Sequence, residues 1–338
     1  MKISKRLALA AIFLCLSTMA GLAEAKDVFF LAGYDKMFVI DGDKDELIKE
    51  IPVEGFLRGM AITKDKKFAY ANGSRRALHK VDLEQGKVVK TLKFDSNGWE
   101  RLIYGFQVDN QAKTAYLSFF SRKLENGQAY VDSPSIAQVD LNTGEILRSV
   151  DIPYGTVTVV LGADGQKVYA VGQDIITIDV SGKDMAIVDT FPMFDKGYNT
   201  LPLHDFTDEN DGIFLGHYYS PTHMGFMTID THTGKITDTP LPGVMAFAYG
   251  FTYNADKTKA IGVMDEIYVI DLKTKTMVGE KKIHSGTKFT LNVSSDDKKI
   301  YVGGGGSVLA VYDAETLKLI KEIHVSTDGG FDLKRVDL

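Results

Sequence analysis

Asp296-Asp297-Lys298-Lys299-Ile300-Tyr301 is a polar turn that leads into alternating apolar residues. Such a pattern is typical of a hairpin entering a half-buried strand. Close copies occur at residues 65–70 and 164–169, and looser copies begin at Asp109, Asp211 and Asp256. The chain therefore repeats one β-rich structural unit.

A second pattern follows most of these copies: an apolar residue, usually β-branched, then an aspartate and a short polar turn. Its aspartates are Asp41, Asp82, Asp140, Asp179, Asp230, Asp271 and Asp313. Their separations are 41, 58, 39, 51, 41 and 42 residues, a period of about 41 with two insertions. Helical repeats of similar period would need apolar residues at a spacing of about 3.6, whereas here they alternate or form short β-branched runs. The pattern predicts an all-β fold, a seven-bladed β-propeller with four antiparallel strands per blade.

The two ends of the repeat region each supply part of one unit. Val28-Phe29-Phe30-Leu31 matches the second strand of a unit, so its first strand is missing. Phe331-Asp332-Leu333-Lys334-Arg335-Val336 remains after the last unit and fits the position of a first strand. We expect the ring to close by pairing of the N-terminal strands with this C-terminal strand, which removes open sheet edges.

The first residues resemble a secretory signal peptide. Lys2, Lys5 and Arg6 precede an apolar run over residues 7–20, and Ala23-Glu24-Ala25 is a typical cleavage site. We therefore expect a signal peptide at residues 1–25, a single propeller domain at residues 26–338 and a periplasmic location. A retained membrane anchor is the alternative, although the apolar run is short for a span.

Composition narrows the chemistry of the mature chain. The sole cysteine, Cys15, lies within the expected signal peptide, so the mature chain would have no disulfide, thiolate metal ligand or covalently attached haem c. A formal net charge of -6 disfavours nucleic acid and anionic membranes as partners. The 44% hydrophobic and 25% charged content is ordinary for a globular protein.

The long insertions should lie on one face of the ring. In a four-stranded blade, the turns between strands one and two and between strands three and four share a face, and here those turns are short. The insertions at residues 94–105, 118–135, 191–206 and 216–225 fall on the opposite face. Their aromatic residues and histidines predict a partner or pocket face formed by Trp99, Tyr104, Phe119, Phe120, Tyr130, Phe194, Tyr198, His204, His217, Tyr218 and Tyr219. The alternative is that several rings only pack the bases of their own loops.

No catalytic motif is evident. His204, His217 and His223 lack a fixed metal-ligand spacing. Residues 303–306 are four glycines, but the lysine and following helix of a phosphate loop are missing. The repeated aspartates are expected to form turns. We therefore expect no metal or cofactor bound by this chain and assign no catalytic residue.

The order of motifs resembles the β-subunit of quinohemoprotein amine dehydrogenase. The matching segments, which span essentially the whole mature chain, lie at residues 26–41, 171–179, 253–260, 284–294, 302–304 and 310–317. The similarity is clearest in the last third and weakest between Phe191 and Met224. It covers generic propeller positions, so the collinear order carries the resemblance.

The resemblance implies a periplasmic heterotrimer. A dihaem cytochrome c subunit would accept electrons, and a small subunit would carry a cysteine tryptophylquinone that deaminates primary amines oxidatively through a Schiff base. The propeller would hold both subunits and help to enclose the amine at their interface, with no independent activity. Two alternatives remain: a free-standing periplasmic or surface propeller that binds a ligand or protein without redox chemistry, and a propeller lactonase.

Overall fold

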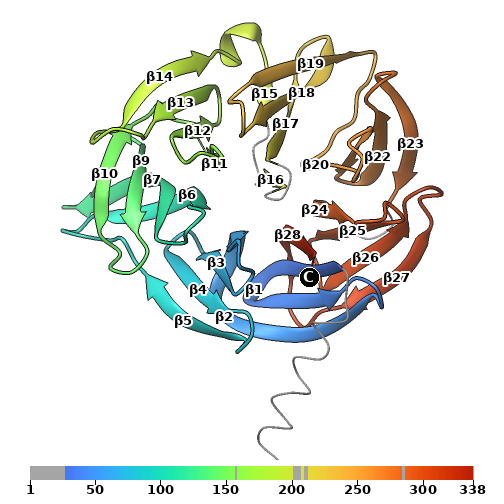
Figure 1. Ribbon diagram of the computed structural model, residues 1–338, viewed down its shortest axis with the longest axis horizontal. Helices are drawn as coiled ribbons and strands as arrows, with labels where there is room; N and C mark the ends of the chain where they lie inside the picture. The colour runs from blue at the N-terminus through green and yellow to red at the C-terminus, as the bar shows by residue number, and fades with distance from the viewer. Residues whose placement is uncertain (1–26, 157, 201–206, 209–211, 284–285, 338) are drawn as a thin grey trace, which may run out of the picture.

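The chain folds into β-sheets arranged as a ring around a central axis (Figure 1). The computed structural model describes residues 27–156, 158–200, 207–208, 212–283 and 286–337. In this part of the chain the one helical segment is a short 3-10 turn, η1 (Phe194–Lys196). The predicted all-β propeller is confirmed.

The strands are grouped here by the aspartate turn of each blade. Blades 1 to 4 contain, in turn, β28 (Gly329–Asp337), β1 (Asp27–Asp41) and the start of β2 (Glu46–Ile62); the end of β2 with β3 (Phe68–Gly73), β4 (Ala77–Asp82) and β5 (Lys87–Leu92); β6 (Glu100–Val108), β7 (Thr114–Glu125), β8 (Gln128–Val131), β9 (Ser135–Asp140) and β10 (Ile146–Asp151); and β11 (Thr158–Leu161), β12 (Lys167–Val171), β13 (Ile175–Asp179) and β14 (Ala186–Phe191). Blades 5 to 7 contain β15 (Asn199–Thr200), β16 (Thr207–Asp208), β17 (Ile213–Tyr219), β18 (His223–Asp230) and β19 (Ile236–Pro242); β20 (Gly250–Tyr253), β21 (Lys259–Val263), β22 (Glu266–Asp271) and β23 (Thr276–Lys282); and β24 (Lys288–Val293), β25 (Lys299–Gly304), β26 (Val308–Asp313) and β27 (Leu319–His324). This grouping fits the seven blades expected from the repeat.

Blade 1 closes the ring with both ends of the chain. Strand β1 folds back on itself, so that its two ends meet: Gly42 N donates to Asp27 O at 2.9 Å. Its first half pairs with β28 from Asp27 opposite Asp337 to Gly33 opposite Gly329, and its second half pairs with β2. The predicted closure of the N-terminal strands on the C-terminal strand is confirmed.

The repeated aspartates organise the turns between the third and fourth strands. Each accepts a hydrogen bond from a backbone N–H two or three residues further on, as in Asp140 with Thr143 N at 2.7 Å and Asp313 with Thr316 N at 2.7 Å. These bonds hold the pKa of the Asp140 and Asp313 carboxyls below the ordinary value. A turn-forming role explains the repeated aspartate.

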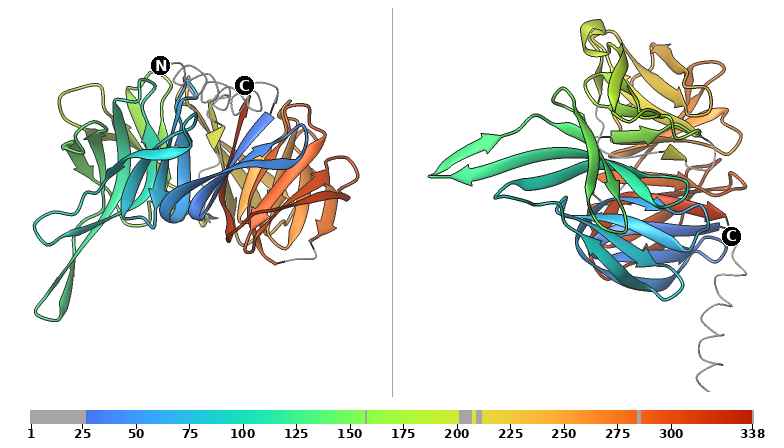
Figure 2. Two further views of the ribbon diagram at one scale, coloured as in Figure 1. Left: turned by 90° about the horizontal axis from the view of Figure 1, so that it is seen from below. Right: turned by 60° about the vertical axis from the view of Figure 1, so that its left-hand side comes forward.

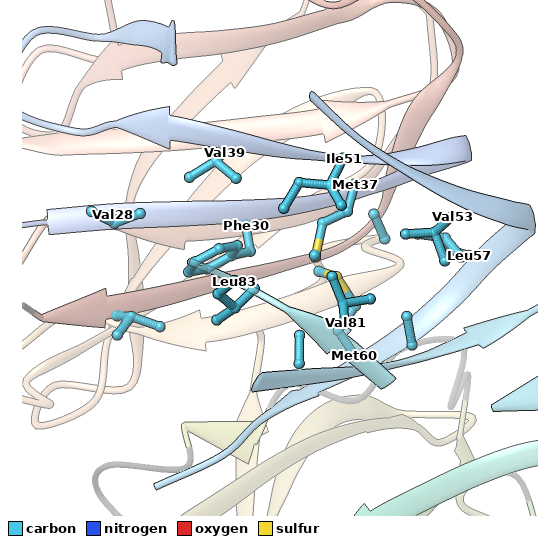
Figure 3. Packing of buried hydrophobic residues seen from close by; sticks show 14 residues of the cluster. Val28, Phe30, Met37, Val39, Ile51, Val53, Leu57, Met60, Val81 and Leu83 are labelled. Carbon is cyan, nitrogen blue, oxygen red and sulfur yellow. The ribbon is translucent and has the colours of Figure 1, made fainter. Parts of the chain in front are cut away.

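Apolar side chains fill the space between neighbouring blades. Between blades 1 and 2, Val28 and Phe30 from the first half of β1 and Met37 from its second half meet Val81 and its neighbours from the next blade (Figure 3). Val28, Met37 and Val81 are fully buried. Strand alternation thus gives each blade two apolar faces, and their stacking makes a rigid support for the loops.

The two faces of the ring differ as the sequence predicts. The turn face carries the short aspartate turns and the end of β28, and the loop face carries the longer connections (Figure 2, left). The insertion at residues 118–135 contains a regular hairpin, in which β7 pairs with β8. Its tip, Asn126-Gly127, has φ values of 51° and 76°, which suit a tight hairpin turn. Residues 121–132, called the arm below, project from the loop face (Figure 2).

None of the described segments forms a helix long and apolar enough to cross a membrane.

Candidate binding site on the loop face

Three of the predicted site residues lie inside the protein. Phe119, Tyr218 and His217 have 2%, 0% and 6% of their surface exposed. The Phe119 ring lies 5.2 Å from the Phe94 ring, within the core between blades 2 and 3. These side chains support the loop face from below and offer little surface to a partner.

Tyr218 and Tyr198 form a stacked pair on one carboxylate. Their ring centroids are 3.8 Å apart, and their hydroxyls donate to Asp238 at 2.7 and 2.9 Å. Burial, and to a smaller extent the Asp238 carboxylate, raises the pKa of Tyr218 far above its ordinary value. The pair fastens the segment that follows η1 to blade 5.

Tyr218→Phe is expected to lower the free energy of unfolding by about 1–2 kcal/mol, because Asp238 loses a hydroxyl donor in a buried position. Tyr198→Phe should cost less, because Tyr198 is only half-buried and water can replace its hydroxyl as a donor to Asp238. Urea denaturation followed by tyrosine fluorescence measures both. Equal losses for the two variants would contradict this assignment.

Tyr219 and His217 shape the next part of the face. The Tyr219 hydroxyl accepts from Ala248 N and donates to Ala246 O, both at 2.9 Å. Its ring stacks on the exposed Phe247 at 5.6 Å. The His217 ring packs beside Tyr219, and burial lowers its pKa to about 4. His217 is therefore a neutral core residue at neutral pH.

Tyr104 and Phe120 come together near the centre of the ring. Their centroids are 4.4 Å apart, and Tyr154 lies 6.3 Å from Phe120. The Arg75 guanidinium lies over the Tyr104 ring at 3.9 Å from its centroid. The site residues predicted in blade 3 thus meet a cation that the sequence analysis did not single out.

A row of aromatic rings continues from this point across blades 2, 1, 7 and 6. We call it the aromatic row, and its members are Phe56, Tyr34, Phe331, Phe289 and Tyr249. Arg58 lies 5.4 Å from the Phe56 centroid and 5.2 Å from that of Phe331. A pocket of about 340 Å³ opens beside the row and is lined mainly by its rings and by Gly304 and Gly305.

The aromatic row escaped the sequence analysis because its members belong to short connections. Phe56 and Phe331 begin innermost strands, and Tyr34 lies at the tip of the β1 hairpin. The available signal was the position itself: the first residues of an innermost strand always reach the loop face near the axis. The length of the insertions instead favoured the outer loops of blades 3 to 5.

The remaining predicted residues lie further out. Tyr130, on the arm, and Phe194, in η1, have 46% and 58% of their surface exposed, and Trp99 is half-buried. His204 lies outside the described residues. On the arm, Leu124 and Val131 are 70% and 60% exposed.

The turn face has its own opening. A cavity of about 570 Å³ lies where the innermost strands end, and its charged and polar lining includes Lys64, Lys66, Asp109, Asn110, Asp164, His232, Asn292, Lys334 and Arg335. Its lysines and arginine come from blades 1 and 2, and its aspartates from blades 3 and 4. Across the described ranges, no three acidic or histidine side chains converge as a metal ion would require.

Comparison with known proteins supports the fold. No family model matches the chain, and no curated protein sequence does either. Among solved structures, a protein of unknown function from Desulfotomaculum acetoxidans aligns with a TM-score of 0.65 at 11% identity, over 90% of this chain and 97% of that one. Hydrazine synthase of Kuenenia stuttgartiensis aligns with a TM-score of 0.58 at 15% identity, over 87% and 90%.

A third solved structure, the dihydro-heme d1 dehydrogenase NirN in complex with DHE, gives a TM-score of 0.58 at 14% identity, over 93% of this chain and 76% of that one. The chain is similar to propeller proteins. At these identities the similarity establishes the fold and leaves the activity to the site.

Proposed function

We propose that this chain is the cofactor-free propeller subunit of a periplasmic quinohemoprotein amine dehydrogenase. It would scaffold a small quinone-bearing subunit and a dihaem cytochrome c subunit and help to enclose the amine between them. The sequence resemblance suggests these partners. The observation that carries the proposal in the structure is the arm, which extends beyond the ring from the face predicted to bind partners (Figure 2).

The arm has an apolar side that its own chain leaves uncovered. In the hairpin, Arg122 pairs with Val131 and Leu124 with Ala129, so these four residues share one side of the ribbon. Leu124 and Val131 are mostly exposed, and a two-stranded ribbon is marginally stable alone. An exposed apolar ribbon of this kind suits burial against another protein.

The rest of the loop face suits an enclosing role. The aromatic row and the rings of Tyr104 and Phe120 provide a broad apolar surface close to the axis. Covering such a surface with a partner subunit would exclude water from the space between them. In the proposed complex the quinone and haem groups belong to the partner subunits, and this chain contributes positioning and exclusion of water.

The test is purification of the tagged complex from its own periplasm, with an absorption spectrum recorded before and after addition of a primary amine. We expect haem c to co-purify and to become reduced by the amine. The double variant Leu124→Ser/Val131→Ser should reduce the co-purified haem at least about tenfold. The matched control is Leu147→Ser/Val188→Ser, whose side chains are 48% and 54% exposed on the outer strands of blades 3 and 4.

Retention of haem by the arm variant would remove the arm from the proposed interface. A colourless propeller without partners would overturn the dehydrogenase assignment. It would leave the second candidate, a free-standing periplasmic or surface propeller that binds a ligand, which the pocket beside the aromatic row favours.

A further inference from the structure

Two arginines at the loop-face end of the axis have no acidic partner among the residues that the structure describes. Arg58 comes from the innermost strand of blade 2, and Arg75 from the β3–β4 turn of the same blade. Neither forms an ion pair with any residue that the structure describes. The Nε of Arg75 is buried and lacks a hydrogen-bond partner in that part of the chain. A buried guanidinium donor without an acceptor is costly, so a missing acceptor is implied.

The nearby carboxylates are already engaged. Arg76, the next residue, pairs with Asp95 at 2.9 Å and with Glu100 at 3.2 Å. Glu100 also pairs with Arg122 at 2.7 Å. Asp95 and Glu100 are thus paired with Arg76, and the Arg75 guanidinium lies over the Tyr104 ring instead.

Arg75 lies in a tight turn that hydrogen bonds hold on both sides. Ser74 and Arg75 have φ values of 49° and 60°, a tight hairpin turn in which Asn-Gly is the preferred pair. The turn is fixed on both sides, because Phe56 N donates to the Ser74 hydroxyl at 2.9 Å and Ile103 N donates to Arg75 O at 2.8 Å. These bonds fix the point from which the Arg75 side chain leaves the backbone.

The two guanidiniums lie close enough to repel each other. Burial lowers the pKa of Arg58, and the charge of Arg75 lowers it further. Aromatic rings support both cations, Phe56 and Phe331 below Arg58 and Tyr104 below Arg75. An arrangement that brings two fixed cations together on aromatic supports is suited to an oxyanion, which guanidinium forks bind through paired hydrogen bonds.

The neighbouring pocket indicates what the oxyanion is attached to. The pocket of about 340 Å³ shares Phe56 and Phe331 with the Arg58 support. It could hold a ring or a short hydrocarbon chain between its aromatic rings, and Thr327 and Asp328 are the polar side chains of its lining. We propose that Arg58 and Arg75 form a binding site for a small carboxylate whose apolar body occupies this pocket. The site uses residues of this chain alone, so it stands whether or not partner subunits exist.

Calorimetric titration of the purified chain with phenylacetate tests the proposal, with phenylacetamide as the neutral match. We expect phenylacetate to bind at least about tenfold more tightly, because the amide loses the charge-assisted hydrogen bonds. Arg58→Gln should weaken phenylacetate binding at least about tenfold. Lys183→Gln, which removes an exposed cation from the outer turn of blade 4, should change it less than about twofold.

Arg75→Gly is the variant that guards against misfolding. Glycine suits the left-handed turn, so this protein should melt at the same or a higher temperature while losing at least about tenfold in phenylacetate affinity. Equal binding of phenylacetamide, or unchanged affinity in Arg75→Gly, would overturn the site. Binding of inorganic phosphate that phenylacetate does not displace would overturn the carboxylate assignment.

Discussion

Ending the chain at Asp328, which removes β28, is expected to abolish the cooperative unfolding transition of the propeller. Strand β28 supplies the innermost strand of blade 1 and pairs with β1 from Asp27 to Gly33. It also connects the neighbouring blades, since Asp332 accepts from Met60 N at 2.7 Å and Arg335 donates to Val293 O at 2.9 Å. Without it, β1 would present an open edge next to an uncovered core. Circular dichroism during heating, with light scattering for aggregation, measures the loss.

A graded form of the same test separates closure from general truncation effects. Leu333→Ala is expected to lower the free energy of unfolding by about 2–5 kcal/mol, because Leu333 is 3% exposed in the core between blades 7 and 1. Leu319→Ala is its match on the outer strand β27, where Leu319 is 50% exposed, and it should cost less than about 0.5 kcal/mol. Similar losses for the two variants, or a sharp transition in the truncated chain, would show that closure contributes little.

The fold was accessible from the sequence because its signals are local and repeated. Each aspartate turn is built from one carboxylate and the N–H groups two or three residues later, so each copy can be recognised in the sequence independently of the others. The closure was accessible for a related reason: Val28–Leu31 and Phe331–Val336 each fit one strand position in the repeat. A mistaken assignment of one blade therefore does not change the assignment of the others.

The arm and the arginine site are the features that the sequence analysis did not predict. Asn126-Gly127 between alternating residues is itself a hairpin signal, which the length and aromatic content of the insertion do not reveal. The arginine site has no local signal of this kind. It depends on Arg58, Arg75 and Phe331 meeting across blades, and on acids near Arg75 being engaged by Arg76. Such competition between neighbours becomes visible only in three dimensions.

Acid is expected to destabilise the propeller through His217, beginning above the pH at which most carboxyls titrate. Burial lowers the pKa of His217 from 6.5 to about 4 in the folded protein. Between these two values the unfolded chain binds a proton at His217 that the folded protein excludes, so stability is complete above pH 6.5 and falls as the pH drops toward 4. The full loss is about 3 kcal/mol. Urea denaturation at pH steps from 7.5 to about 4.5 measures most of this loss, above the ordinary aspartate pKa of 3.8.

His217→Gln isolates this contribution, because glutamine cannot be protonated in that range. The variant is expected to be less stable at pH 7.5, since its amide replaces a ring packed against Tyr219 and Phe251. Its unfolding free energy should then fall much less than that of the native protein between pH 6.5 and 4.5. Parallel curves would mean that the native His217 ring accepts its proton without cost, through water or a rotation within the core. The His217 ring packs directly against Tyr219. If His217 is protonated without cost, acid would leave the packing of these two rings beneath the loop face unchanged.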